Sequence, residues 1–494
     1  HSYIKRKGFE ENVLVGTTLV DMYAKCGLLV EAGEAFDKLH VRNVISWNAL
    51  ITAYVEYGYA GESLIFFKQM QIEGVSPNSG TFVCILKACG KEKVVDEASE
   101  IHSQLARKGL LESDVNVGNT LVDMYGKCGM LHRAQEVFDK LPIRNVLSWN
   151  ALISGFDEHG HSEKAVKCYY KMQLEGVVPD IVTYICSLKA CARIGAIDHG
   201  EEIHAKLARF EGLQENEIVM NTLIHMYAKC GLLLKAQDVF DKALIQNVVT
   251  WNALISGYAE YDYGEEALQC FEHMTSQGMI PNNATYIFSL KACANVGATN
   301  KGQEIHADIE RKGCFGRDLA VDSALVNMYA KSGMLTVAER VFNKLPVRGI
   351  VSWNSMIAGY AKCGSNESVF HTFHNMLNEC VKPDLVTFLN LLHACSQTGM
   401  SDKGQTFFEA MSKDFGMLPT LKHHTCRLHL LGRAGHFDKI ANLITGLPFS
   451  PDRALWHSVL GACVMWGNVN LGIRAFERAR CLPIAHAGAF GVKS

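Results

Sequence analysis

The sequence of 494 residues lacks the features that mark several broad classes of protein. It contains no apolar run of about 18 residues or more, so no membrane-spanning helix is expected. Its 48 Lys and Arg stand against 51 Asp and Glu, so no overall positive field indicates nucleic acid. It also lacks a phosphate-binding glycine loop and a G-x-S-x-G elbow. We therefore expect no enzyme activity, no cofactor and no membrane partner.

What the sequence has instead is one phrase repeated along its length. Trp-Asn occurs at Trp47, Trp149, Trp251 and Trp353, each 102 residues after the last. A degraded copy places Trp456 103 residues beyond Trp353. A second phrase, Met-Tyr-Ala-Lys-Cys-Gly at 22–27, returns with small changes at 124–129, 226–231 and 328–333. Self-similarity at a fixed spacing indicates a repeat array.

Each 102-residue cycle divides at turn signals into units of 31, 35 and 36 residues, first seen as Val13–Asn43, Val44–Asn78 and Ser79–Asp114. Thirteen complete units occupy residues 13–452, and the last of them has 32 residues. Residues 1–12 are the end of a partial long unit, and residues 453–480 begin a further helical unit. Residues 481–494 form a divergent tail.

Every unit has the pattern of two helices. In the first, an apolar series at helical spacing ends at Cys26-Gly27 and a second series follows. A proline one residue before the end of each 35-residue unit stops the second helix, at Pro77, Pro179, Pro281 and Pro383. One helix pair cannot bury its own apolar stripe, so the pairs must stack. The pattern predicts an α-solenoid with first helices along its concave face.

The 17 cysteines form no Cys-x-x-Cys pair, and many follow the repeat at Cys26, Cys128 and Cys230 and at Cys89, Cys191, Cys293 and Cys395. Equivalent residues lie three helix pairs apart, more than about 24 Å, so they cannot share a metal or a disulfide. We interpret them as small buried apolar residues in a reducing compartment. The same spacing argument makes the repeated His102, His204 and His306 structural rather than metal ligands. His161-Ser-Glu163 resembles a zinc-deaminase motif but has no Pro-Cys-x-x-Cys to complete it.

These motifs resemble the pentatricopeptide repeats of the plant PLS subclass. NTLIHMYAKCGLLLKAQDVF, VVTWNALISGYAEYDYGEEALQCFEHMTSQGMIPN and SLKACANVGATNKGQEIHA match its short, ordinary and long forms. The resemblance implies an all-α fold, a right-handed α-solenoid superhelix of stacked antiparallel helix pairs in S-P-L order. Leu421–Asp452 resembles the last short repeat, and residues 453–480 resemble the start of the family's E-type extension. Residues 481–494 depart from the family.

Tetratricopeptide arrays, which bind proteins, are the nearest alternative. Trp47, Leu50 and Tyr54 fit their spacing, but Ile51 takes the place of their Gly. Unit lengths of 31, 35 and 36 also replace their fixed 34, so the pentatricopeptide assignment is preferred.

Polar residues recur at two places in all but the 36-residue units. The fifth residues are Thr17, Asn48, Asn119, Asn150, Asn221, Asn252, Ser323, Asn354 and Thr425. The last residues are Asn43, Asn78, Asn145, Asp180, Asn247, Asn282, Gly349, Asp384 and Asp452. Helix capping is one interpretation of the last residues, but it does not explain Asn and Thr one turn inside a helix. The 36-residue units carry apolar residues at the fifth place: Val83, Ile185, Ile287 and Leu389.

The resemblance implies that each pair recognises one base of single-stranded RNA. By the family's pairing, Thr17 with Asn43 indicates A and Thr425 with Asp452 indicates G. Asn with Asp indicates U, at Asn150/Asp180 and Asn354/Asp384. Asn with Asn indicates a pyrimidine, at Asn48/Asn78, Asn119/Asn145, Asn221/Asn247 and Asn252/Asn282. Ser323 with Gly349 is assigned no base. With the 36-residue units silent, the predicted target is 5′-A-Y-N-Y-U-N-Y-Y-N-N-U-N-G-3′.

Two further recurrences have alternative interpretations. Cations end the first helix of the short units, at Lys25, Lys127, Lys229, Lys331 and Arg433, and suit either the helix dipole or RNA phosphates. The four repeated tryptophans are core residues or, less simply, stacking platforms for bases. In the family, small aliphatics such as those at Ile45, Leu147, Val249 and Val351 neighbour the bases instead.

The expected function is recognition of single-stranded RNA in a mitochondrion or chloroplast. The subclass and the terminal unit favour a monomeric site-recognition factor for C-to-U RNA editing, with a deaminase-bearing protein and editing accessory proteins supplied in trans. The alternatives are an RNA processing, stability or splicing factor, a protein-interaction scaffold that binds no RNA, and a non-functional fragment.

Overall fold

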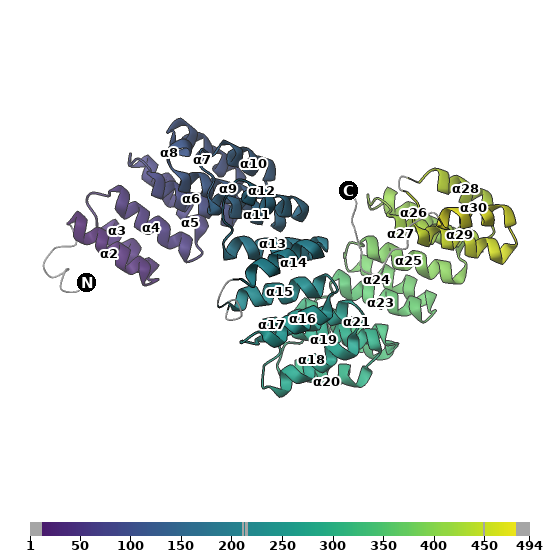
Figure 1. Cartoon of the computed structure of the whole chain (residues 1–494). Coiled ribbons are helices and arrows are strands. Elements are labelled where there is room, and N and C mark those ends of the chain that lie inside the picture. The colour runs from purple at the N-terminus through teal and green to yellow at the C-terminus, as the bar shows by residue number, and fades with distance from the viewer. Residues whose placement is uncertain (1–11, 210–211, 213–215, 448–449, 481–494) are drawn as a thin grey trace. The chain divides into compact units, whose positions relative to one another are not determined.

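The described part of the chain is helical throughout. A computed structural model describes residues 12–209, 212, 216–447 and 450–480, and these residues contain no strand. They form two compact units, His1–Met226 and Tyr227–Ser494, which we call unit 1 and unit 2. No helix in the described ranges is long and apolar enough to cross a membrane. Figure 1 shows the helix pairs of each unit stacked one after another. The expected all-α repeat fold is confirmed.

Unit 1 consists of helix pairs and one short helix. Its first helices are α2 (Val13–Lys25), α4 (Val44–Glu56), α6 (Ser79–Glu92), α9 (Val115–Lys127), α11 (Val146–Glu158) and α13 (Ile181–Ile194). Its second helices are α3 (Leu29–Asp37), α5 (Ala60–Ile72), α7 (Val95–Arg107), α10 (Leu131–Lys140), α12 (Ser162–Leu174) and α14 (Ile197–Leu207). The short helix is α8 (Leu110–Ser113), and α15 (Glu217–Lys229) runs across the division between the units.

Unit 2 repeats this alternation. Its first helices are α17 (Val248–Glu260), α19 (Asn283–Val296), α21 (Leu319–Lys331), α23 (Ile350–Lys362), α25 (Leu385–Thr398), α27 (Leu421–Arg433) and α29 (Arg453–Trp466). Its second helices are α16 (Leu233–Lys242), α18 (Gly264–Ser276), α20 (Thr299–Arg311), α22 (Leu335–Lys344), α24 (Asn366–Asn378), α26 (Ser401–Lys413), α28 (Phe437–Thr445) and α30 (Val469–Arg480). Within each unit, consecutive first helices pack against one another and form a continuous layer.

The first helix of every predicted repeat begins at the first residue of that repeat, as α4 does at Val44 and α6 at Ser79. The preceding residue is therefore the helix cap. Between the two helices of a short repeat, the glycine of the second recurring phrase has φ of 74°, 75°, 78° and 79° at Gly27, Gly129, Gly231 and Gly333. This left-handed backbone favours glycine and explains why the phrase ends on it.

The repeated tryptophans belong to the core. Trp47, Trp149, Trp251 and Trp353 are at most 2% exposed. Each lies edge-on to a phenylalanine in the second helix of the preceding repeat, with ring centroids 4.5–4.7 Å apart, at Phe36, Phe138, Phe240 and Phe342. The core interpretation is confirmed, and the alternative of base-stacking platforms is wrong because these rings are covered.

The expected burial of the repeated cysteines is confirmed for some of them. Cys89, Cys191, Cys293 and Cys395 are fully buried, and burial raises the pKa of the Cys89 thiol to about 12. Cys128 and Cys230 are half-buried. Cys26 is exposed, which corrects the expectation of burial: it is the residue that caps the C-terminal end of α2, next to the turn at Gly27.

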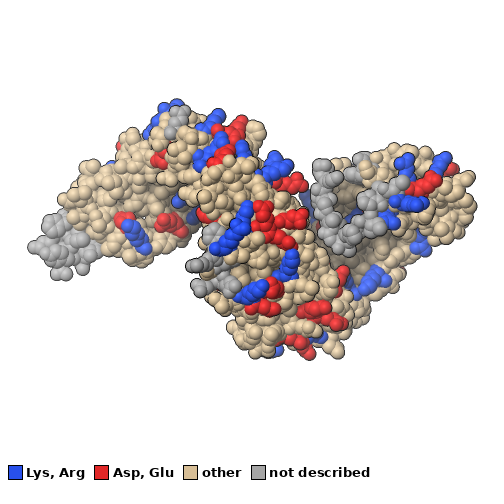
Figure 2. All heavy atoms as spheres, in the orientation of Figure 1, with Lys and Arg blue, Asp and Glu red and all other residues tan. Residues whose placement is uncertain are grey.

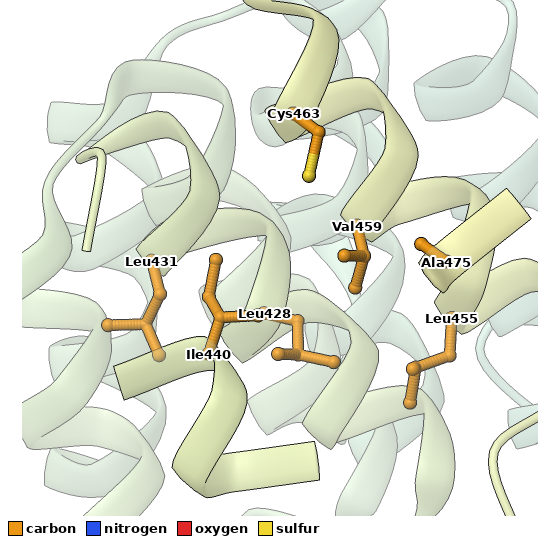
Figure 3. Packing of buried hydrophobic residues seen from close by; sticks show 7 residues of the cluster. All are labelled: Leu428, Leu431, Ile440, Leu455, Val459, Cys463 and Ala475. Carbon is orange, nitrogen blue, oxygen red and sulfur yellow. The ribbon is translucent and has the colours of Figure 1, made fainter. Parts of the chain in front are cut away.

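Residues 453–480 continue the stack. α29 and α30 form a further helix pair that packs on α27 and α28 through a shared apolar cluster (Figure 3). Its buried members are Leu428, Leu431, Ile440, Leu455, Val459, Cys463 and Ala475. The predicted tail at 481–494 and most of the partial unit at 1–12 lie outside the described residues.

Candidate nucleic-acid interface

Among the described residues, the fifth and last residues of a repeat are joined by a side-chain hydrogen bond in five cases. In each, the fifth-residue Asn donates a hydrogen bond from Nδ2 to Oδ1 of the last residue. The distances are 3.1 Å for Asn48–Asn78, 3.1 Å for Asn119–Asn145, 3.0 Å for Asn150–Asp180, 3.0 Å for Asn252–Asn282 and 3.0 Å for Asn354–Asp384. Residues 26 or 30 positions apart are thus joined into one polar pair per repeat.

The last residue of the pair also caps the next helix. Oδ1 of Asp180 accepts the backbone N–H of Thr183 at 2.8 Å, and Asn78 does the same for Thr81 at 3.0 Å. These bonds satisfy amides that a helix N-terminus leaves without partners. The capping interpretation is therefore correct for these residues. It uses only one side-chain oxygen, so it leaves the second polar atom of the Asn or Asp available.

A threonine fixes the amide of the fifth residue wherever a 35-residue repeat precedes a 36-residue repeat. The third residue of the 36-residue repeat donates its hydroxyl to Oδ1 of the fifth-residue Asn. The donors are Thr81 to Asn48 (2.6 Å), Thr183 to Asn150 (2.6 Å), Thr285 to Asn252 (2.7 Å) and Thr387 to Asn354 (2.7 Å). Sequence reasoning missed these threonines, although they also recur every 102 residues.

The two contacts determine which polar groups remain for a ligand. With Oδ1 turned to the threonine and one N–H to the last residue, the fifth-residue Asn has one N–H left. A last residue that is Asn adds a free Nδ2, whereas Asp adds a free Oδ2. Asn150, Asn252 and Asn354 are only 7–8% exposed, so little of each amide is open to a ligand.

The carboxyl group of Asp180 is held in its charged form. Burial alone raises its pKa, but hydrogen bonds from the Thr183 backbone, the Asn150 amide and the Thr183 hydroxyl outweigh burial and bring the pKa below its usual value. Asp180 therefore presents a carboxylate, which only accepts hydrogen bonds, at neutral pH.

The 31-residue repeats form a different kind of pair. Asn119 bonds Asn145, but the next third residue is Ser148, whose hydroxyl donates to the backbone oxygen of Asn145 at 2.8 Å. The Oδ1 atom of Asn119 is consequently buried without a hydrogen-bond partner among the described residues. Asn221 belongs to unit 1 and Asn247 to unit 2, so their pairing stays a prediction.

Three predicted pairs have no hydrogen bond between their side chains among the described residues. Thr425 donates its hydroxyl to the Leu421 carbonyl oxygen at 2.9 Å, and Ser323 donates to Leu319 at 2.7 Å. Their partners Asp452 and Gly349 lie at the start of α29 and α23, where Asp452 caps through its side chain and Gly349 has none. Within the described ranges the hydroxyl of Thr17 is buried without a partner, while Asn43 caps α4. A short hydroxyl does not span the gap that the asparagine amide spans.

Exposed aliphatic side chains accompany the pairs. Three residues before each fifth-residue Asn of the 35-residue repeats lies an apolar side chain that is 55–63% exposed: Ile45, Leu147, Val249 and Val351. Residues three apart share a helix face, so these aliphatics flank the polar pairs.

The cations at the ends of the short-repeat first helices are mostly engaged with protein groups. Lys25 bonds Asp21 at 2.7 Å, Lys127 bonds Asp123 at 2.6 Å, and Lys229 bonds Glu260 at 2.5 Å. Arg433 donates to the Ser396 carbonyl oxygen. Figure 2 shows the same mixing of basic and acidic side chains on the face in view. These contacts therefore do not favour a row of unengaged cations that bind phosphates at these positions.

The repeated histidines hold helices together. Nδ1 of His102 lies 2.9 Å from the Tyr125 hydroxyl, and Nδ1 of His306 lies 3.0 Å from that of Tyr329. Burial lowers the pKa of both imidazoles. No group of three or more His, Cys, Asp or Glu within the described ranges is arranged to hold a metal. The structural interpretation of His102 and His306 is confirmed.

Comparison with known families finds matches along the chain. A model described as PPR repeat family matches residues 42–91, 144–193, 246–295 and 348–397. A model described as PPR repeat matches residues 17–44, 119–146, 218–246, 323–350 and 386–414. The first set spans the 35-residue repeats with the start of the 36-residue repeats, so it contains both members of the threonine-fixed pairs.

Similar proteins include two pentatricopeptide repeat-containing proteins of Arabidopsis thaliana. One, named as chloroplastic, is 34% identical over 478 residues, which are 97% of this chain and 59% of that protein. The other is 34% identical over 454 residues, 91% of this chain and 73% of that protein. The chain thus spans less than two thirds of the first relative. The crystal structure of the pentatricopeptide repeat protein PPR10 with an 18-nt psaJ RNA element has a TM-score of 0.59 at 19% identity, covering 99% of this chain and 72% of that one.

Replacing Thr183 by Val tests whether the hydroxyl holds the Asn150–Asp180 pair. The change leaves Asn150 Oδ1 and the Asp180 backbone N–H without their bonds to it, which costs about 1–3 kcal/mol of unfolding free energy. It also raises the pKa of Asp180. The lowered pKa stabilises the folded chain above the unfolded value of about 3.9, and this stabilisation is lost as pH falls through the folded pKa. The deficit of the variant therefore shrinks at acid pH.

Hydrogen exchange of residues 180–187 and urea denaturation between pH 7 and pH 3 measure this deficit. Thr183→Ser keeps the hydroxyl and should behave as the parent. Thr120→Val removes a hydroxyl that bonds only its own helix, so about 0.5 kcal/mol or less is expected. Equal stability of the Thr183→Val variant and the parent protein would show that the hydroxyl does not hold the pair.

Proposed function

The chain belongs to the pentatricopeptide repeat family, and from this premise we propose that it is a sequence-specific binder of single-stranded RNA. One observation carries the proposal: among the described residues, the side chains of the fifth and last residues converge in five repeats, and each pair keeps a polar group on both of its members unbonded. Free groups of this kind suit the edge of an unstacked base.

The free groups explain why Asn/Asp and Asn/Asn pairs select different bases. Asn150 with Asp180 offers an N–H donor beside a carboxylate acceptor. The Watson–Crick edge of uracil carries the complement, an N3–H donor between two carbonyl acceptors. Asn48 with Asn78 offers donors only, and cytosine presents N3 and O2 acceptors side by side. We therefore expect Asn/Asp to favour U, and among pyrimidines Asn/Asn to favour C.

The exposed aliphatics support the same placement of the base. Ile45, Leu147, Val249 and Val351 lie one turn from the pairs, where an apolar side chain packs against the face of a base. Such contacts are tolerant of sequence, so the amide and carboxylate groups carry the discrimination. Each good polar pair discriminates by about 1–3 kcal/mol, and several in series select one transcript.

The biological role we propose is site recognition for C-to-U editing of organellar transcripts. The S-P-L order of unit lengths and the helix pair at 453–480 support the PLS subclass with an E-type extension. The name of the chloroplastic relative supports an organelle, with a mitochondrion as the other candidate. The deaminase and accessory proteins act in trans in this proposal. The second candidate role is RNA processing, stability or splicing, which uses the same recognition without editing.

Binding to a 13-nucleotide RNA tests the proposed recognition. The chain should bind 5′-A-Y-N-Y-U-N-Y-Y-N-N-U-N-G-3′ more tightly than scrambled RNAs of the same composition, by about tenfold or more for each pair of mismatches. Fluorescence anisotropy at several salt concentrations measures this difference. Equal affinity for all RNAs would contradict the base-per-repeat scheme, and absence of binding would favour a protein-interaction scaffold.

Sequencing organellar transcripts separates the two roles. In source plants without the gene, at least one cytidine that is normally converted to uridine should stay unconverted, and the predicted RNA sequence should lie just upstream of it. Complementation with the full gene should restore conversion. If every site is still edited while transcript ends, splicing or abundance change, the processing role is the correct one.

A further inference from the structure

The first helix of each 36-residue repeat exposes a single stripe of side chains. In α6, Thr81, Phe82, Ile85, Leu86, Ala88, Cys89 and Gly90 are buried. Between the two ends of this helix, the exposed or half-buried residues are the second, fifth, sixth, ninth and thirteenth of the repeat: Gly80, Val83, Cys84, Lys87 and Lys91. The same places are open in α13 and α19. This set, which we call the long-repeat stripe, lies on one helix face because its members are three or four residues apart.

The long-repeat stripe adjoins the polar pairs. A Cβ added at Gly80 would lie 3.4 Å from Nδ2 of Asn48 and 3.4 Å from Oδ1 of Asn78. One turn further along, Cys84 contacts Thr52 of α4 at 3.0 Å between sulfur and hydroxyl. Lys87 follows Gly80 by two helical turns, about 10 Å along the axis. The ninth residue therefore lies on the same helix face as the residue beside the polar pair, two turns away.

The stripe member at the ninth place of the repeat is a lysine without a hydrogen bond or salt bridge in the described part of the chain. It is Lys87 in α6, Lys189 in α13 and Lys291 in α19, and none of the three has a hydrogen bond or a salt bridge there. The thirteenth residues differ. Lys91 donates to the Val55 carbonyl oxygen at 2.6 Å, and Arg193 donates to that of Asp157. The stripe thus contains one engaged position and one unengaged ammonium group.

The ninth residues of the neighbouring repeats supply no free carboxylate to these lysines. The ninth residue of the preceding 35-residue repeat is uncharged, at Thr52, Ser154 and Ser256. In the 31-residue repeat that follows Lys87, the ninth residue is Asp123, and its carboxylate is bonded to Lys127 at 2.6 Å. The ninth residues of the other two following repeats are His225 and Asn327. Among these first helices, a lysine at the ninth place is therefore found only in the 36-residue repeats.

We propose that the 36-residue repeats bind phosphates of the RNA through Lys87, Lys189 and Lys291. The inference rests on the proposed RNA-binding function and assigns a role to repeats whose apolar fifth residues recognise no base. A lysine ammonium is a mobile point charge that suits a phosphate without demanding a fixed geometry. The three lysines are 102 residues apart, so they contact the backbone once in three nucleotides. The fourth 36-residue repeat has His393 at this place and is not included.

The test is the salt dependence of binding to the 13-nucleotide RNA. Replacing the three lysines by Ala should make the slope of log affinity against log salt shallower by about 2, because each phosphate contact to single-stranded RNA contributes about 0.7. Replacement by Arg keeps the charge and should keep the slope. The matched control is Lys140→Ala with Lys167→Ala and Lys344→Ala, which removes the same charge from exposed positions in the second helices α10, α12 and α22. That control should leave the slope unchanged.

The preference for the predicted RNA over scrambled RNA separates this inference from the proposed function. Phosphate contacts carry no sequence information, so the Ala variant should keep the parent's ratio of affinities. A parent without any preference would overturn the proposed function. A parent with the preference, but with the same slope as the Ala variant, would overturn the phosphate role alone. Equal flattening in the variant and in the control would also overturn it, because net charge and not position would then be the cause.

Discussion

The arrangement depends on one requirement, that the free backbone N–H groups at the start of each first helix find an acceptor. The residue before the helix meets it with a side-chain oxygen, as Asp180 does for α13. That residue closes one repeat and starts the next, so capping fixes its side chain at the junction. An asparagine one turn inside the preceding first helix then reaches the same oxygen. Capping therefore builds the polar pair and joins neighbouring repeats at once.

The unequal repeat lengths give the junctions different chemistry. Where a 35-residue repeat meets a 36-residue repeat, a threonine hydroxyl turns to the fifth-residue amide and fixes its orientation, as Thr387 does for Asn354. Where a 31-residue repeat meets a 35-residue repeat, the hydroxyl turns to the cap residue's own carbonyl oxygen, as in Ser148. The Oδ1 atom of Asn119 is then left without a partner among the described residues. Two Asn/Asn pairs at different kinds of junction therefore differ in which polar groups stay unbonded.

Much of this was predictable from the sequence, because periodicity reports which residues share a face. The repeat boundaries, the core tryptophans and the two polar positions follow from the 102-residue cycle. Periodicity does not report which atoms of neighbouring repeats bond. The threonine hydroxyls, the Lys127–Asp123 ion pair and the exposure of Cys26 depend on contacts that only the folded chain defines. For the same reason Thr425 and Ser323 occupy the predicted place but bond their own helix.

The most direct measurement compares four RNAs that differ only at the fifth nucleotide, with the parent protein and Asp180→Asn. Asn78 already occupies the equivalent place beside Asn48, so the fold accommodates the change. We expect the parent to prefer U and the variant to prefer C, with a swing of about tenfold. The preference for U at the eleventh nucleotide, assigned to Asn354 and Asp384, should not change. If both proteins rank the four RNAs alike, the pair at the end of this repeat does not recognise a base.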